Sequence, residues 1–274
     1  MKKLNKLLGV FVLLLLVGAC KKEPPLPPET PAKYDKGILT LNEGLFEQNN
    51  ASLSFYDGTT EYQLVFNSEN QRGLGDTAND FEAYNVGGLE FIIIAVDVSS
   101  QIEIINRRTL KSIAQIPLFK EVDGETIERS PRRVAVKGLN AYVCNFDGTV
   151  AVINLVNYTV DQIIEVGANP DGMLFLDNRL YVSNSGGLLS PVYDSTISVI
   201  DLATNTVVET IETRINCSQL VADNEGDIYL LSRGNYMDVE PAMLRINTTT
   251  NMVEEITEKS MSSMTIIDDW MYFY

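Results

Sequence analysis

The chain contains no histidine and only three cysteines, and it is poor in positive charge. Without histidine it cannot form a Ser-His-Asp triad, a Cys-His dyad, or a His-ligated zinc or non-haem iron site. Its 21 Lys and Arg residues are outnumbered by 37 Asp and Glu residues, which gives a formal net charge of -16. Because such a charge repels nucleic acid and anionic lipid surfaces, we expect no nucleic-acid partner.

Long hydrophobic runs are also missing, apart from one at the N-terminus. Residues 1–19 have a basic start, an apolar run from Leu7 to Val17 and small residues before Cys20. This pattern is typical of a secretory signal, and the run is short for a transmembrane helix, which needs about 20 residues. The segment "VGAC" resembles the bacterial lipobox, in which the cysteine is lipidated. The sequence therefore predicts a signal peptide over residues 1–19 and lipidation at Cys20.

Prolines cluster directly after this cysteine. The segment "KKEPPLPPETPAKYDKG", Lys21 to Gly37, has five prolines and no apolar periodicity. We expect residues 20–36 to be an extended tether that precedes a folded domain over residues 37–274. The remaining cysteines, Cys144 and Cys217, lie in or beside apolar runs of non-adjacent repeat units. We therefore expect two buried free thiols rather than a disulfide.

The folded domain carries a repeat whose period shortens along the chain. In each unit an alternating apolar run ends in Asp or Asn, and a polar turn and a second alternating run follow. The runs end at Asp57, Asn106, Asn154, Asp201 and Asn247, at spacings of 49, 48, 47 and 46 residues. A full unit reads as four short antiparallel strands, such as "GMLFL", "LYVSN", "TISVID" and "VVETIE". Four-stranded units of this length predict an all-β fold, a β-propeller.

The first and last units are irregular. The first begins at "ILTLN", which aligns with the second strand of the other units, so it lacks an innermost strand. The last ends within its second strand. We therefore expect a domain of about five and a half blades that is truncated at its C-terminus. A seven-bladed ring would need roughly 75 to 85 further residues, and a six-bladed ring stays an alternative.

Nearly all long loops of this predicted propeller fall on one rim, which carries the loops between second and third strands and those between blades. Long loops on a rigid scaffold commonly carry binding sites, and aromatic and arginine side chains are common anchors. The candidate ligand-binding residues on this rim are Phe46, Arg72, Arg132, Arg133, Asn145, Asn184, Tyr193, Arg233 and Tyr236. We predict no catalytic residue, no metal site and no cofactor.

Three segments resemble known propeller proteins. "YVSNSGG" and "ANPDG" are similar to the "YVTN" strand and the "xxPxG" inter-blade turn of the YVTN-type repeat. "LNEGLFEQNNASLSFYD", following a lipoprotein signal, resembles the surface propeller lipoproteins of Bacteroidota, which include cobalamin-capturing proteins. The resemblance extends from Gly37 to Tyr274. It implies a non-catalytic protein, anchored by lipid to the outer membrane at the cell surface, that passes a corrinoid (vitamin B12) to a TonB-dependent transporter.

Two other classes of function stay open at this stage. Some propellers are calcium-dependent enzymes that open lactones or cleave cyclic substrates, and this chain has many Asp, Glu and Asn oxygens that suit Ca²⁺. Such a site would bring three or more of these oxygens to the central mouth. A third possibility is adhesion to glycans or to a protein partner, for which we expect a flat surface rather than a pocket.

Overall fold

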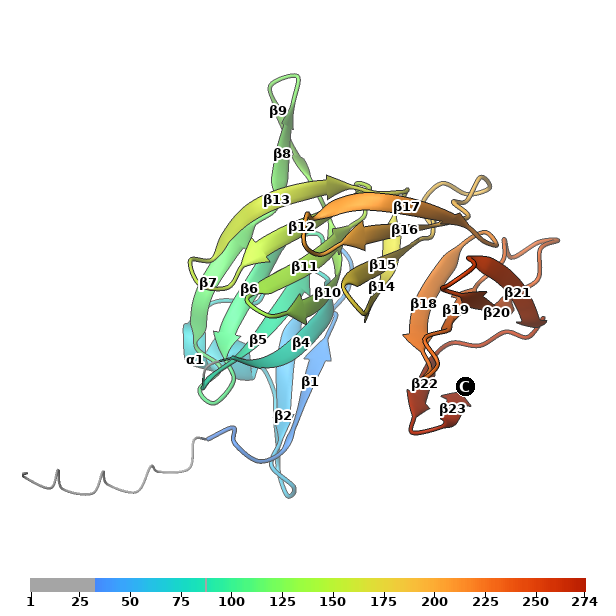
Figure 1. Cartoon of the computed structure of the whole chain (residues 1–274). Helices are drawn as coiled ribbons and strands as arrows, with labels where there is room; N and C mark the ends of the chain where they lie inside the picture. Colours follow the sequence, from blue (N-terminus) through green and yellow to red (C-terminus); the bar gives the residue numbers. More distant parts are fainter. Residues whose placement is uncertain (1–32, 87) are drawn as a thin grey trace, which may run out of the picture. The chain divides into compact units, whose positions relative to one another are not determined.

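The computed structural model describes residues 33–86 and 88–274, so the predicted signal peptide, Cys20 and most of the tether lie outside the described residues. The described part consists of antiparallel strands and one short helix, α1 (Figure 1). The elements are β1 (Ile38–Asn42), β2 (Ser52–Tyr56), β3 (Glu61–Tyr62), α1 (Val65–Asn70), β4 (Ala78–Val86), β5 (Leu89–Val96), β6 (Gln101–Asn106), β7 (Ser112–Pro117), β8 (Phe119–Val122), β9 (Glu125–Glu128), β10 (Pro131–Lys137), β11 (Asn140–Asn145), β12 (Thr149–Asn154), β13 (Thr159–Glu165), β14 (Pro170–Leu176), β15 (Arg179–Asn184), β16 (Thr196–Asp201), β17 (Thr206–Glu212), β18 (Cys217–Ala222), β19 (Ile228–Ser232), β20 (Ala242–Asn247), β21 (Met252–Thr257), β22 (Met264–Ile267) and β23 (Trp270–Phe273).

Four consecutive sheets have the predicted four strands in meander order: β4 to β7, β10 to β13, β14 to β17 and β18 to β21. The innermost strands β4, β10, β14 and β18 contact one another in chain order. This arrangement confirms the all-β, propeller-type fold, and we call each four-stranded sheet a blade, numbered 2 to 5. As predicted, the sheet before them has three strands and begins with the equivalent of a second strand, β1.

The Asp and Asn residues that mark the repeat close the turns between third and fourth strands. In blade 3, the Asn154 Oδ1 accepts the backbone N–H of Val156 at 2.9 Å, and the Asn154 carbonyl accepts the N–H of Tyr158 at 2.9 Å. The side chains of Asp57, Asn106, Asp201 and Asn247 accept backbone N–H groups in the same way. Asn and Asp favour such turns because their short side chains mimic a backbone acceptor. The regular spacing of these Asp and Asn residues therefore reflects the need for a side-chain acceptor in each of these turns.

The hydrophobic core lies between successive blades. One cluster joins β5 and β6 of blade 2 to β11 and β12 of blade 3, and another joins blades 4 and 5. The middle strands are packed on both faces, so they read as unbroken apolar runs such as "VAVI". Cys144 and Cys217 are buried free thiols in this core, as predicted. Burial raises the pKa of the Cys217 thiol to about 12, so it is unreactive at neutral pH.

Two segments that the sequence placed in loops are regular elements. Helix α1 lies between the first sheet and blade 2, and it buries Val65 and Phe66. Strands β8 and β9 form a hairpin between blades 2 and 3. Its turn, Asp123 and Gly124, has φ of 53° and 85°, as a two-residue type I′ turn requires. The dipeptide Asp-Gly between alternating residues is a hairpin signal that the loop assignment overlooked.

Candidate functional site

The innermost strands share a local distortion that builds the candidate site. Each begins with a β-bulge, at Ala78/Asp80, Pro131/Arg133, Pro170/Gly172 and Cys217/Leu220. Each is preceded by a non-glycine residue in the left-handed region: Thr77, Ser130, Asn169 and Asn216. A bulge leaves one residue out of the regular pairing and re-aims its side chain. The bulged residues of blades 2, 3 and 4 are Asn79, Arg132 and Asp171.

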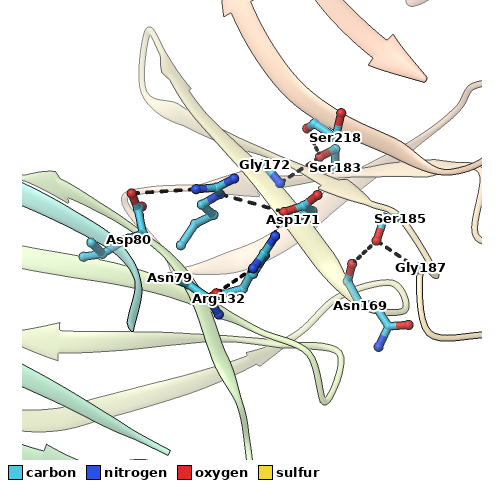
Figure 2. A network of polar contacts seen from close by, with 12 residues as sticks. Asn79, Asp80, Arg132, Asn169, Asp171, Gly172, Ser183, Ser185, Gly187 and Ser218 are labelled. Atoms are coloured by element: carbon cyan, nitrogen blue, oxygen red, sulfur yellow. Dashed lines mark hydrogen bonds and ion pairs between the residues drawn. The ribbon is translucent and has the colours of Figure 1, made fainter. Parts of the chain in front are cut away.

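Arg132 links these three blades. Its Nη1 donates to Asn79 Oδ1 at 2.7 Å, and its Nε donates to Asp171 Oδ1 at 3.2 Å. Figure 2 shows Arg132 between these two partners. The guanidinium also lies over the Phe146 ring, 5.4 Å from its centroid, where a cation is attracted to the aromatic face. Successive inner strands are thus joined by side chains that the bulges turn toward one another.

Two further arginines reach the same carboxylate. Arg233, which follows β19, donates from Nη1 to Asp171 Oδ2 at 2.7 Å. Arg133 Nε lies 3.8 Å from Asp171 Oδ1, and its Nη1 lies 3.8 Å from Asp80 Oδ1. The Asp171 side chain is 5% exposed, whereas that of Arg233 is 37% exposed. Burial raises the pKa of Asp171, but Arg233, Arg132 and Arg133 lower it by more, so the pKa falls below its usual value.

We call Arg132, Arg133, Arg233 and Asp171 the arginine cluster. Two pockets open at it, of about 450 Å³ and about 210 Å³, and Asp171 and Arg233 line both. The larger pocket also has hydroxyl and amide side chains on its walls: Ser218, Gln219, Ser262 and Ser263. The smaller pocket is lined by Arg132 and by the aromatic and apolar side chains of Phe146, Leu188 and Tyr236. The cluster therefore offers hydrogen-bond donors to two differently lined cavities.

The rim loops supply the walls of the smaller pocket. Phe146, Leu188 and Tyr236 come from the loops between second and third strands of blades 3, 4 and 5. Arg132 and Asp171 lie in the bulges at the starts of β10 and β14, directly after the inter-blade segments. This confirms the prediction that these two groups of loops share one rim. Asn169 holds the Leu188 part of the wall in place, because its Oδ1 accepts the Leu188 N–H at 3.0 Å.

Of the nine predicted ligand-binding residues, the structure brings four together: Arg132, Arg133, Arg233 and Tyr236. Phe46 lies in the loop between β1 and β2 and is 68% exposed. Tyr193 is partly exposed in the loop between β15 and β16. Neither side chain lines the two pockets at the arginine cluster. Their roles as ligand contacts stay predictions.

Three further predicted ligand residues have structural roles. Asn145 and Asn184 end the second strands of their blades and are fully buried. The Asn184 Nδ2 donates to Ser198 Oγ at 3.0 Å, and Asn145 likewise bonds within its own sheet. Arg72 forms an ion pair with Glu103, 2.8 Å from each carboxylate oxygen, at the edge of the core of blade 2. These roles depend on tertiary packing, and none of the three side chains lines the two pockets at the arginine cluster. Their roles as ligand contacts stay predictions.

The sequence reasoning missed Asn79, Asp80 and Asp171. A signal was available, because four inter-blade segments align: "TAND", "SPRR", "NPDG" and "NCSQ". Their first residues are the left-handed ones and their third residues lie in the bulges. Asn79, Arg132 and Asp171 therefore occupy equivalent positions in these segments.

Two carboxylates on β4 lie beside the backbone of β10. Asp80 Oδ2 accepts the backbone N–H of Val134 at 3.0 Å, and the backbone of Val136 favours the charged form of Glu82. Burial raises the pKa of both groups, and it raises that of Glu82 to about 7, with the neighbouring Asp80 adding to the effect. Folding therefore favours the protonated form of Glu82. The stability that protonated Glu82 contributes is fully present below its ordinary pKa of 4.5. This stability is lost as the pH rises through 7.

Replacing Glu82 with glutamine is expected to raise the free energy of unfolding at pH 8 by about 1–2 kcal/mol, after allowance for partial exposure. Glutamine keeps the size and shape of the side chain and carries no charge. At pH 4.5 the two proteins should have equal stability. Urea unfolding at both pH values measures the difference, with Glu165→Gln as an exposed control. A Glu82→Gln effect of the same size at both pH values would contradict this account.

The described ranges 33–86 and 88–274 contain no group of three or more Cys, Asp or Glu side chains placed to hold a metal ion. Within the same ranges, no helix has the length and apolar character needed to cross a membrane.

The family model described as "Domain of unknown function (DUF5074)" matches residues 36–268. The chain belongs to this family. No curated protein matches the DUF5074 chain. Among solved structures it is similar to hydrazine synthase of Kuenenia stuttgartiensis, with 19% identity and a TM-score of 0.52 over 64% of this chain and 47% of that one.

The DUF5074 chain is also similar to the WD40 β-propeller domain of Doa1, with 13% identity and a TM-score of 0.50 over 72% of this chain and 57% of that one. The DUF5074 chain thus spans about half the length of both chains. At these identities the likeness concerns the propeller fold alone.

Proposed function

We propose that the DUF5074 chain is a non-catalytic binding protein, that its ligand enters at the arginine cluster, and that this ligand is a corrinoid. The observation that carries the proposal is the convergence of Arg132, Arg133 and Arg233 on Asp171 where two pockets open. Guanidinium groups donate several N–H bonds and suit amide oxygens and phosphate. A corrinoid offers both, because its macrocycle carries amide side chains and its nucleotide loop carries a phosphodiester.

The wall chemistry of the larger pocket supports the same class of ligand. Hydroxyl and amide side chains, such as Ser218 and Gln219, both donate and accept hydrogen bonds. Amides of a ligand need partners of both kinds. A corrinoid is larger than a typical pocket ligand, so it would extend from the larger pocket over the rim, where Leu188 and Tyr236 are 70% and 72% exposed.

We further propose that the protein is anchored through Cys20 to the outer membrane at the cell surface and delivers the corrinoid to a TonB-dependent transporter. The support lies in the sequence: a signal-like N-terminus, the "VGAC" segment, a proline-rich tether and the resemblance to surface propeller lipoproteins. A tether of this composition holds a domain away from its lipid anchor.

The geometry supports a binder better than the two alternatives. A calcium-dependent lactonase or lyase needs several oxygen ligands for Ca²⁺. The arginine cluster instead surrounds one carboxylate with three guanidinium groups, which repel a divalent cation. Adhesion to a glycan or a protein suits a flat surface, whereas this site has two concave pockets.

Isothermal titration calorimetry with cyanocobalamin tests the proposal. We expect saturable heat at one site per chain, and an affinity that falls at least about tenfold in Arg133→Gln, because hydrogen bonds to a charged group are lost. Arg245→Gln is the matched control, since Arg245 pairs with buried Asp227 on blade 5 and lines neither pocket of the cluster. Absence of heat at micromolar protein would overturn the corrinoid proposal.

A further inference from the structure

We infer that the smaller pocket is a subsite for an aromatic organic anion, a flat ring that carries a carboxylate or phosphate group. Arg132 and Arg233 hold the anionic group, and Phe146, Leu188 and Tyr236 form the wall that faces the ring. The inference rests on the proposed binding function and names the chemistry of one part of the ligand.

The charges of the pocket favour an anion. Its charged lining residues are Arg132, Arg233 and Asp171, which gives a local excess of one positive charge in a chain whose net charge is -16. Within the described residues, the Arg233 side chain hydrogen-bonds only to Asp171, through one of its five N–H donors. Arg233 is also 37% exposed at its side chain, so its remaining donors are open to a ligand.

The apolar wall favours a ring attached to that anion. Leu188 and Tyr236 leave 70% and 72% of their surface in contact with solvent. Phe146 already stacks under the Arg132 guanidinium, which fixes the position of that cation over an aromatic face. A flat apolar body beside the two arginines would cover these side chains and remove apolar surface from water.

Hydrogen bonds within its own loop hold the Tyr236 part of the wall. Tyr236 has a left-handed backbone with φ of 60°, an unusual conformation for a large residue. Asn235 holds it there, because its Oδ1 accepts the backbone N–H groups of Met237, Asp238 and Val239 at 2.9–3.0 Å. A loop held by its own hydrogen bonds loses less entropy on binding than a loop without them.

The size of the pocket limits the ligand. Its volume is about 210 Å³. An engineered protein cavity of about 150 Å³ holds benzene, and pockets for drug-sized ligands start at about 300 Å³. One ring with one charged group therefore fits, and a larger ligand would place only such a group in this pocket.

Ligand-observed NMR with four probes tests the inference. Phenyl phosphate and benzoate are aromatic anions, inorganic phosphate lacks the ring, and phenol is uncharged at neutral pH. We expect one or both aromatic anions to bind with a Kd of about 1 mM or tighter, and the other two probes to bind at least about tenfold more weakly. Which aromatic anion binds more tightly identifies the preferred charged group.

Two variants locate the site. Arg233→Gln should weaken binding of the aromatic anion at least about tenfold. Arg245→Gln removes the same charge from the same blade, next to a similarly buried aspartate, and should change the affinity less than about twofold. Equal losses in both variants would show a general charge effect and overturn the inference. Inorganic phosphate binding as tightly as phenyl phosphate, or no aromatic anion binding, would also overturn it.

This experiment is independent of the corrinoid titration. Aromatic anions that bind while cyanocobalamin gives no heat would support the subsite and remove the corrinoid. Cyanocobalamin that binds while all four probes fail would leave the corrinoid proposal in place and overturn the subsite.

Discussion

Replacing Arg72 with methionine is expected to lower the free energy of unfolding by about 3 kcal/mol without weakening ligand binding at the arginine cluster. The Glu103 side chain is fully buried, and Arg72 lies 2.8 Å from both of its carboxylate oxygens. The Arg72 guanidinium lies over the Phe66 ring, 4.9 Å from its centroid, and methionine retains an apolar side chain beside this ring. The charge of Glu103 would then have no opposite charge next to it, and an uncompensated buried charge is strongly destabilising.

A double-mutant cycle separates this effect from simple loss of packing. In the double variant Arg72→Met, Glu103→Met the buried charge is gone, and an apolar pair in place of a buried ion pair is close to neutral. Most of the lost stability should therefore return, as measured by urea unfolding, with a coupling energy above about 1 kcal/mol. A double variant less stable than Arg72→Met alone would show that the ion pair is not what stabilises this edge of blade 2.

The local parts of the fold were predictable because their causes are local. Asn154 and its equivalents mark the repeat since each accepts backbone N–H groups two or three residues further along the chain. The middle strands read as apolar runs because both of their faces are buried. A chemical requirement that is satisfied within a few residues leaves a pattern in the sequence, and the blades could be counted from it.

The candidate site was predictable only in part, because it depends on which strands become neighbours. Arg132, Arg133 and Arg233 were selected as rim residues, and the structure brings them together. Asp171, the residue on which they converge, comes from the next blade along the chain from Arg132. It looked like part of an ordinary turn in "ANPDG". The bulge that re-aims it is a property of pairing between β14 and β15, which a single strand does not reveal.

The same limit applies to the structural contacts of Asn184 and Arg72. Asn184 ends "YVSN" at the start of a long rim loop, so its position favoured exposure. Its side chain turns toward the third strand instead and donates to Thr196 and Ser198. Arg72 likewise lies in a long segment between blades, and its partner Glu103 is 31 residues away in the sequence. Neither contact has a local signature.

Replacing Asp171 with asparagine is expected to lower the free energy of unfolding at pH 7 by about 2–3 kcal/mol, because three guanidinium groups would lose the anion that they share. The value lies at the low end for buried ion pairs since the arginines are partly exposed. The pKa of Asp171 is lowered by these arginines, so its contribution is present above the ordinary value of 3.8 and is lost as the pH falls below it. The difference in the free energy of unfolding between the native protein and the variant should therefore become smaller in acid.

Asp227→Asn is the matched control for this variant. Asp227 is 7% exposed at its side chain, close to the 5% of Asp171, but it faces one arginine, Arg245. We expect a loss of about 1 kcal/mol there. Equal losses for the two variants would contradict the view that Asp171 neutralises a cluster rather than a single partner.

The Asp171→Asn variant is also expected to bind an added anion at the arginine cluster. With the carboxylate gone, Arg132, Arg133 and Arg233 are left with an uncompensated positive charge, and phosphate can take the place of the missing anion. A ligand that binds only the folded state stabilises it by RT ln(1 + [L]/Kd). Phosphate should therefore raise the melting temperature of Asp171→Asn by more than that of the native protein or of Asp227→Asn. If phosphate raises all three equally, its effect is a general salt effect, and the arginine cluster does not act as an anion site.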